Sequence, residues 1–323
     1  MNELIPVLQN FIGLDNAAIV EFITDWGGPL GSWIVLQLVF IFAGLRQGLQ
    51  LALIATIAFV TNSWLKWVFM EPRPFHINHD LVALGGVGDF GMPSGHAQGA
   101  AAFWGALGWL WRRRVWLLVS LISFAIVVGM TRIYLAAHSP AQVVVGLGLG
   151  FAIAYVVLAR WDRLVERLSS IAWETRWWLL AAAIAITLLV GELILSFNSG
   201  FVAPQRWIEG FARAEGIDTA TAADLLLFVN STLIIGGIGA GFGALALLNE
   251  KWSCEIAGAK SRWLCFLGAI VGNVLALTAL GFALEQRIAV LGFAVSVLYP
   301  LVALYLPMRI FRARWAPLGE DHD

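Results

Sequence analysis

Charged residues are scarce in this sequence. Only 13% of its 323 residues are Asp, Glu, Lys or Arg, whereas an ordinary soluble domain has about 25%. So few charges cannot cover a surface that faces water, particularly when 60% of the residues are hydrophobic. The composition excludes a water-soluble globular protein and indicates that lipid surrounds most of the chain.

Cysteine is also nearly absent, because the chain has only Cys254 and Cys265. They form no C-x-x-C pair, which excludes a metal site of that spacing and a disulfide framework. Cys265 lies in an apolar run and is expected to be a buried, inert thiol. Residues 1–26 carry four acidic residues and lack a basic segment, so no cleavable signal peptide is expected.

Long apolar runs, in contrast, are abundant. A helix needs about 20 mainly apolar residues to cross a bilayer. We predict about nine spans, near residues 29–45, 48–69, 96–111, 115–135, 139–159, 177–197, 223–247, 263–284 and 288–308. Residues 1–26 are predicted to form an amphipathic helix that lies at one membrane face. The sequence therefore predicts an all-α, polytopic membrane protein.

Basic residues are placed asymmetrically around these spans. If the spans alternate in direction, the basic segments all fall on one side: Arg46, Arg112 to Arg114, 160–176, 251–262 and 309–314. Short basic loops mark the cytoplasmic side of a membrane. The N-terminus and the loops 70–95, 136–138, 198–222 and 285–287 are then expected on the outer side. A bacterial inner membrane is the expected location.

Two glycine-rich stretches superficially resemble phosphate-binding loops. They run from Gly146 to Gly150 and from Gly236 to Gly243, and both lie inside apolar spans. Small residues four positions apart allow two helices to approach closely. We interpret both stretches as helix-packing surfaces.

Three polar clusters fall at span ends on the predicted outer face: Lys66 to Pro74, Pro93 to His96, and Arg132 to Gln142. Lys66, Arg73 and Arg132 are cations without a nearby run of acids. Ionisable groups at a membrane boundary usually mark a function, and the planar fork of arginine matches phosphate oxygens. The clusters predict a site for a phosphate group.

The second cluster leads directly into a predicted helix. Free backbone N–H groups and the positive end of the helix dipole favour an anion there. Ser94 adds a hydroxyl donor, and Gly95 lets the backbone approach a ligand closely. The predicted ligand is a tetrahedral dianion.

Two histidines, His96 and His138, belong to separate helices that meet at this site. One can attack phosphorus while the other protonates the departing oxygen. We predict no metal and no other cofactor, because the cations can supply the electrostatic stabilisation that a metal usually gives. The remaining titratable residues of the 70–95 loop are interpreted as solvated rather than as metal ligands: His76, His79, Asp80 and Asp89.

In order and spacing, these clusters resemble the three signature motifs of the type-2 phosphatidic acid phosphatase (PAP2) family. The matching residues are Lys66-x6-Arg73-Pro74, Pro93-Ser94-Gly95-His96 and Arg132-x5-His138. The resemblance implies that His96 is a general acid and that His138 forms a phosphohistidine. It implies that the phosphate is bound by Lys66, Arg73, Arg132, Ser94 and Gly95.

The resemblance covers residues 66–142 and implies a six-helix core. We expect an amphipathic N-terminal segment at 1–28, the phosphatase-like core at 29–197, and an additional region of about three spans with a basic tail at 198–323.

Two positions depart from the pattern of the family. Thr131 stands where the family has Ser, and Gln142 stands where it has Asp. Gln142 follows His138 by four residues, so both lie on one helix face and the amide oxygen can accept the imidazole N–H. An amide cannot supply a negative charge, and in a serine-protease triad the equivalent change costs about 10⁴ in kcat. Gln142→Asp is therefore expected to raise kcat.

The resemblance implies a metal-independent phosphoric ester or diphosphate hydrolase. Its expected partner is a membrane lipid, either a phosphomonoester or a polyprenyl diphosphate, and no nucleic acid is expected. Two alternatives remain open. One is a lipid phosphotransferase of the same family, and the other is a lipid-phosphate binding or transport protein in which Gln142 has weakened turnover.

Overall fold

The computed structural model of this chain describes residues 3–84, 88–226, 239, 241–243, 252–255, 262–272, 289–302, 306–307 and 314–317. Helices dominate these residues, which confirms the predicted all-α fold. Two short strands, β1 (Trp252–Glu255) and β2 (Arg314–Pro317), pair in antiparallel fashion. The chain divides into two compact units. The first holds Met1–Ser32, Ile57–Val156 and Gly191–Asn230, and the second holds Trp33–Thr56, Val157–Val190 and Ser231–Asp323.

The first six predicted spans all appear as helices. They are α3 (Pro29–Leu38), which continues as a π-helix over Val39–Ala43, α4 (Leu45–Phe69), α6 (Gly95–Leu110), α7 (Val115–Tyr134), α8 (Pro140–Ser169) and α9 (Trp173–Phe197). In length and composition, four segments within the described residues can cross a membrane: Leu45–Ile77, α7, α8 and α9. The bent pair Leu14–Gly27 and Pro29–Ala43 adds a fifth if it is one span. The chain is therefore an integral membrane protein.

Of the last three predicted spans, 223–247 lies largely outside the described residues, and 263–284 and 288–308 lie partly outside them. Helix is described over 262–272 and in α14 (Ala289–Pro300).

The second unit has an aromatic cluster. The rings of Phe40 and Phe242 stack with centroids 5.8 Å apart, and those of Trp33 and Tyr299 approach to 4.8 Å.

Two helices form the N-terminal segment, where the sequence predicts one. α1 (Leu4–Ile12) ends at Gly13, whose φ of +83° favours glycine, and α2 (Ala17–Gly27) follows a short 3₁₀ turn. Both helices pack against α7. The side-chain amide of Gln9 donates to the carbonyl of Tyr134 at 2.8 Å, and the Tyr134 hydroxyl donates to the carbonyl of Gly13 at 2.7 Å. The segment is thus tied to the C-terminal end of α7.

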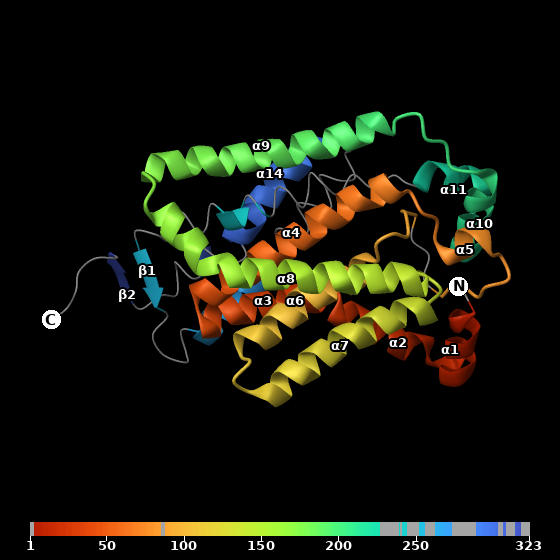
Figure 1. Cartoon of the computed structure of the whole chain (residues 1–323), viewed down its shortest axis with the longest axis horizontal. Helices are drawn as coiled ribbons and strands as arrows, with labels where there is room; N and C mark the ends of the chain where they lie inside the picture. The colour runs from red at the N-terminus through yellow and green to blue at the C-terminus, as the bar shows by residue number, and fades with distance from the viewer. Residues whose placement is uncertain are drawn as a thin grey trace. The chain divides into compact units, whose positions relative to one another are not determined.

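The first glycine-rich stretch packs α8 against α6, as predicted. A Cβ atom at Gly146 would lie 2.7 Å from the carbonyl oxygen of Ser94, and one at Gly150 would lie 2.3 Å from that of Gln98. α6 also pairs with α7, and Figure 1 shows the two helices joined by the short turn that follows α6. In the second stretch, from Gly236 to Gly243, a Cβ atom at Gly241 would lie 2.4 Å from the carbonyl oxygen of Val297 in α14, so this glycine also allows close helix packing.

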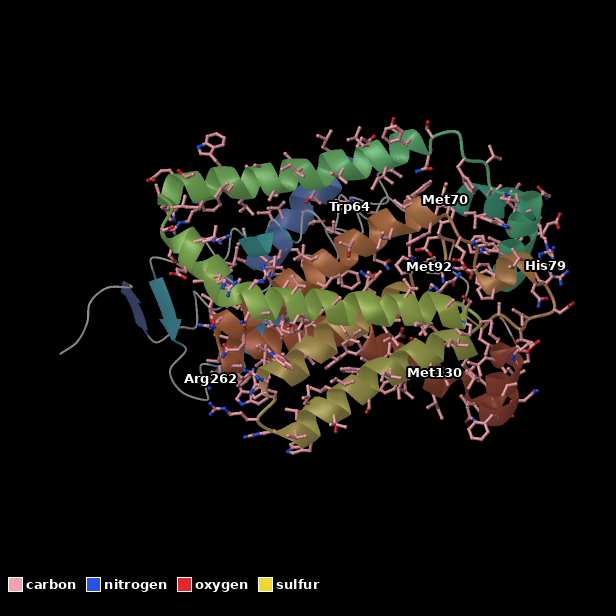
Figure 2. The ribbon with its side chains drawn as sticks, viewed as in Figure 1. Trp64, Met70, His79, Met92, Met130 and Arg262 are labelled. Carbon is pink, nitrogen blue, oxygen red and sulfur yellow. The ribbon has the colours of Figure 1, made fainter. Side chains whose placement is uncertain are left out.

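A helical layer from residues beyond α9 covers the loop after α4. α10 (Gln205–Glu215) packs against α5 (Pro74–Ile77) and α11 (Thr219–Leu225). Their apolar contact includes Phe75, Phe211 and Leu226. The guanidinium of Arg213 donates to the carbonyl of His79 at 3.0 Å, and Figure 2 shows His79 beside α10.

Candidate active site

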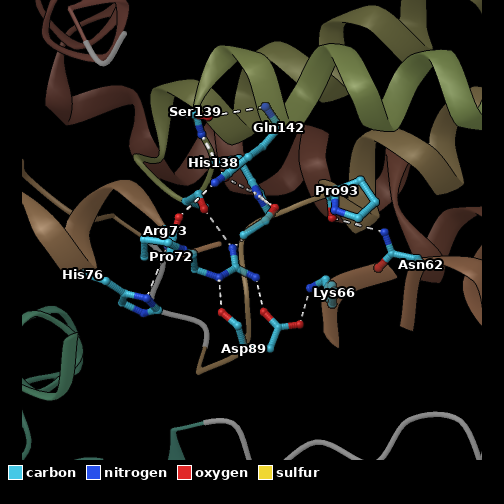
Figure 3. Close-up of polar contacts among 12 residues, drawn as sticks. Asn62, Lys66, Pro72, Arg73, His76, Asp89, Pro93, His138, Ser139 and Gln142 are labelled. Atoms are coloured by element: carbon cyan, nitrogen blue, oxygen red, sulfur yellow. Dashed lines mark hydrogen bonds and ion pairs between the residues drawn. The ribbon is translucent and has the colours of Figure 1, made fainter. Parts of the chain in front are cut away.

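The structure brings the three polar clusters together within the first unit, as Figure 3 shows for several of their residues. Lys66 lies in the last turn of α4, and Arg73 directly precedes α5. His138 lies between α7 and α8, and its backbone N–H donates to the carbonyl of Arg132 at 3.1 Å. The loop therefore folds back over the end of α7, which explains how five intervening residues bring Arg132 and His138 to one site.

Arg73 is the central cation of the site and is buried. Its NH1 group donates to the carbonyl of Ala137 at 2.8 Å and lies 2.9 Å from Nε2 of His138. Its Nε donates to the backbone carbonyl of Asp89 at 2.9 Å. Arg73 thus points directly at Nε2 of His138.

Asp89 is an unpredicted member of the site. Its carboxylate forms ion pairs with both Lys66 and Arg73, and 24% of the side chain remains exposed. Burial alone would raise the pKa of Asp89, but the attraction of Arg73 and Lys66 outweighs it and lowers the pKa below its ordinary value. The interpretation of Asp89 as a solvated loop residue was wrong, because its carboxylate pairs with two of the three cations.

The other titratable residues of this loop differ in their surroundings. His76 is buried rather than solvated, and its Nδ1 accepts from the backbone N–H of Arg73 at 3.3 Å. His79 lies 3.0 Å from the carbonyl of Arg206 through Nε2, and Asp80 is exposed. Within the described parts of the chain, no three His, Cys, Asp or Glu residues group in a way that could hold a metal ion.

Ser94 and the start of α6 are held in place from two sides. The backbone N–H of Ser94 donates to the carbonyl of Gln142 at 3.0 Å, and its hydroxyl caps α6 by accepting from the N–H of Ala97 at 3.5 Å. The amide of Asn62 donates to the carbonyl of Pro93 at 3.2 Å. Asn62 lies one helical turn before Lys66 on the same face of α4, which is the signal that could have identified it from the sequence.

The N-terminal segment forms a wall of the site. Arg132 donates from NH1 to the hydroxyl of Thr24 in α2 at 3.5 Å. Its Nε is buried and has no hydrogen-bond partner among the described residues, which leaves a donor for an anion. A Cβ atom at Gly28 would lie 2.7 Å from the carbonyl oxygen of Thr24 and 2.8 Å from the ring of His96, so only glycine fits at that position.

The amide of Gln142 has only one workable orientation. Its Oε1 accepts from the backbone N–H of Ser139 at 3.1 Å, and its Nε2 donates to the carbonyl of Pro72 at 2.9 Å. The reverse orientation would set two donors against each other at Ser139 and two acceptors at Pro72. The oxygen of the amide therefore faces His138.

This orientation fixes the tautomer of His138. Nδ1 lies 2.8 Å from the carbonyl of Gly91 and 3.2 Å from Oε1 of Gln142. Both partners can only accept, so Nδ1 carries the proton and Nε2 carries the lone pair. Burial, followed by the charges of Arg73 and Arg132, lowers the pKa of His138 well below its usual value. The imidazole is therefore neutral, with its lone pair on Nε2.

Comparison with known proteins agrees with these motifs. Residues 47–166 match the PAP2 superfamily. An undecaprenyl-diphosphatase of Sulfolobus acidocaldarius is 32% identical over 141 residues, which are 43% of this chain and 67% of that protein. This chain belongs to the PAP2 superfamily.

Two further PAP2 relatives are glucose-6-phosphatase catalytic subunits. The protein of Haplochromis nubilus is 28% identical over 183 residues, 47% of each chain, so the match spans about half of that relative. The protein of Felis catus is 27% identical over 300 residues, which are 80% of this chain and 79% of that protein. No solved structure matches.

The PAP2 match contains the three clusters but leaves out residues 1–46. Thr24 and Gly28, which contact Arg132 and His96, therefore lie outside it. Of the two departures, Thr131 is explained locally, because its buried hydroxyl donates to the carbonyl of Val128 at 2.6 Å within α7. Gln142 instead takes part in the hydrogen bonds that orient His138.

Backbone strain is concentrated beside the PAP2 motifs. Met70 and Ala136 are non-glycine residues with positive φ, at 45° and 57°. Met70 lies between Lys66 and Arg73, and Ala136 lies between Arg132 and His138. Such conformations persist where the surrounding structure requires them, and they are frequent at functional sites.

Proposed function

We propose that this chain is a metal-independent phosphatase that acts on a lipid phosphomonoester or a polyprenyl diphosphate. The observation that carries the proposal is the lone pair on Nε2 of a buried, neutral His138, placed beside cationic side chains. Lys66, Arg73 and Arg132 bind the phosphate oxygens, with Ser94, Gly95 and the N-terminus of α6.

In the first step, Nε2 of His138 forms a bond to phosphorus as the bond from phosphorus to the leaving oxygen breaks. The bound phosphate dianion offsets the nearby cations and favours the protonated imidazole of His96, which donates its proton to that oxygen. The phosphate oxygens take over the NH1 group of Arg73, which releases Nε2 for attack. The cations stabilise the charge on the three remaining oxygens, as a preorganised site does most effectively.

In the second step, neutral His96 accepts a proton from water while the water oxygen bonds to phosphorus. The phosphorus–nitrogen bond breaks and returns its electron pair to Nε2. The products are inorganic phosphate and neutral His138, with His96 protonated again. Throughout, the oxygens of Gly91 and Gln142 accept hydrogen bonds from the N–H at Nδ1 of His138 and hold the ring in one orientation.

A soluble sugar phosphomonoester is a second candidate substrate. The relative from Felis catus, named as a glucose-6-phosphatase catalytic subunit, aligns with 80% of this chain. The undecaprenyl-diphosphatase supports the lipid substrate but aligns with 43% of the chain. Both substrates have the phosphate group for which the site is built.

Phosphate release tests the proposal and separates the two candidates. The purified protein in detergent is given phosphatidic acid, undecaprenyl diphosphate or glucose 6-phosphate, each with a chelator present. Release from either lipid supports the first candidate, and release from glucose 6-phosphate alone supports the second. No release from any of the three would contradict the phosphatase proposal.

Activity is expected to resist chelators and to be blocked by vanadate. The positive charge that a metal would provide comes from protein side chains, and vanadate forms a five-coordinate mimic when Nε2 of His138 occupies one position. Phosphate release is measured with excess chelator and then with increasing vanadate. A strict requirement for added magnesium would contradict the metal-free mechanism.

We place the site on the outer face of a bacterial inner membrane. This orientation predicts that single cysteines at positions within 78–84 or 200–215 react with an impermeant maleimide added to whole cells. Single cysteines at 252–260 should react only after the cells are opened. The starting protein has both native cysteines replaced by serine, and the reverse labelling pattern would place the site in the cytoplasm.

Asp89→Asn is expected to lower KM for a phosphomonoester by about tenfold, because the Asp89 carboxylate competes with the substrate for Lys66 and Arg73 and repels its dianion. An asparagine can still accept from Arg73, and the backbone carbonyl of residue 89 keeps its bond to Nε of Arg73. Asp80→Asn, an exposed change on the same loop, is the control. A higher KM in Asp89→Asn alone would mean that Asp89 chiefly orients the cations.

A further inference from the structure

Glu71 lies at the end of the hydrogen-bond chain that runs from His138 through Gln142. Oε1 of its carboxylate accepts from Nε2 of Gln142 at 3.1 Å. Its backbone carbonyl accepts from the N–H of Gly91 at 2.7 Å. Gly91 and Gln142 are the two residues whose oxygens accept from Nδ1 of His138. Glu71 therefore supports both acceptors, although it does not touch His138 itself.

We propose that Glu71 is a positioning residue and that Glu71 and Gln142 together replace the single aspartate expected at position 142. The inference rests on the proposed function, since it concerns the orientation and charge of the nucleophile. Gln142 supplies the oxygen that accepts the hydrogen bond from Nδ1 of His138. Glu71 supplies the negative charge and polarises the intervening amide, because a charged acceptor strengthens each hydrogen bond in such a chain.

The surroundings of Gln142 explain why a carboxylate does not fit there. Its amide nitrogen faces two acceptors, Oε1 of Glu71 and the carbonyl of Pro72, and the residue is buried. A carboxylate at 142 would face a second carboxylate and a carbonyl oxygen without a proton between them. Two carboxylates in one buried site cannot both be ionised readily. Glutamine at 142 and glutamate at 71 are thus a matched pair.

This pairing changes the expectation for substitutions at 142. Gln142→Asp was expected to raise kcat when only His138 was considered. With Glu71 in contact, an acidic residue at 142 instead brings repulsion between two carboxylates. Gln142→Glu is the sharper test, because glutamate has nearly the same shape as glutamine and changes only the charge and the donor.

The experiment compares the wild type, Glu71→Gln, Gln142→Glu and the exchanged double variant Glu71→Gln/Gln142→Glu. Hydrolysis of p-nitrophenyl phosphate gives kcat and KM, and vanadate affinity is measured on the same preparations. Asp80→Asn is the matched control, since Asp80 lies on the same loop but is exposed. Monodispersity and thermal unfolding in detergent show that each variant is folded.

Glu71→Gln is expected to lower kcat by about tenfold and to change KM by less than about twofold, because the hydrogen bond to Gln142 survives and only the charge is lost. Gln142→Glu is expected to lower kcat by about a hundredfold near pH 8. The loss of kcat should be smaller near pH 6. There, a proton shared by the two carboxyl groups replaces the hydrogen-bond donor that the amide of Gln142 provided. The exchanged variant should recover to within about tenfold of the wild type, because one charge and one amide are again paired.

Two results would overturn the inference while leaving the phosphatase proposal intact. One is a Glu71→Gln variant with wild-type kcat. The other is an exchanged variant whose loss of kcat equals the product of the losses in the two single variants. If the wild type shows no turnover, the same four-way comparison of vanadate affinity decides the coupling. A wild type without turnover and without vanadate binding would overturn the proposed function, and this inference with it.

Discussion

His138→Ala is expected to lower kcat by about 10⁴ or more on every phosphate substrate, because no other side chain replaces the Nε2 lone pair. His96→Ala should behave differently. A general acid contributes about 10² to 10⁴ when the leaving group is poor. A leaving group of low pKa departs without a proton, so p-nitrophenyl phosphate should be affected far less than phosphatidic acid.

Both variants are measured on both substrates. In His96→Ala, the loss on p-nitrophenyl phosphate should be at most about a tenth of the loss on phosphatidic acid. Equal losses on the two substrates would contradict the role of His96 as the acid. His79→Ala is the control, because His79 lies on the loop beside α10 and outside the site.

Arg132→Ala is expected to lower kcat/KM by about 10² to 10³, the usual cost of losing one preorganised donor to a developing charge. Nε of Arg132 is buried without a described partner, so its donor is available for a phosphate oxygen. Arg132→Lys should recover only part of the loss, since an ammonium group cannot reproduce the planar fork.

Thr24→Val is the matched control for Arg132. It removes the hydroxyl that accepts from NH1 at 3.5 Å but leaves the guanidinium in place. If Thr24→Val lowers kcat/KM as much as Arg132→Ala does, Arg132 acts through its link to α2 rather than through phosphate binding.

The sequence was sufficient to predict the long helices α4, α7, α8 and α9 and the cationic motifs. Apolar runs of membrane length identify α4, α7, α8 and α9 without knowledge of their neighbours. The polar residues that interrupt or end such runs, such as Lys66 and Arg132, stand out because they are costly there.

Asp89 and Glu71 could not be predicted in the same way. Each acts through a partner that the folded loop brings close, Lys66 for Asp89 and Gln142 for Glu71. In the sequence, an acidic residue of a polar loop that pairs with another side chain cannot be told from one that is only solvated. The same limit applies to the N-terminal segment, where the amphipathic pattern predicts helix but does not show that the side with Ile5 and Val20 packs on α7.

Detection of phosphorylated His138 tests the central claim most directly. The protein is mixed with p-nitrophenyl phosphate, quenched in alkali within the first turnover and digested for mass spectrometry. We expect one phosphoryl group on the peptide that contains His138, stable in alkali, lost in acid and absent from His138→Ala. A phosphoryl group on another residue, or hydrolysis by His138→Ala at the wild-type rate, would contradict the account.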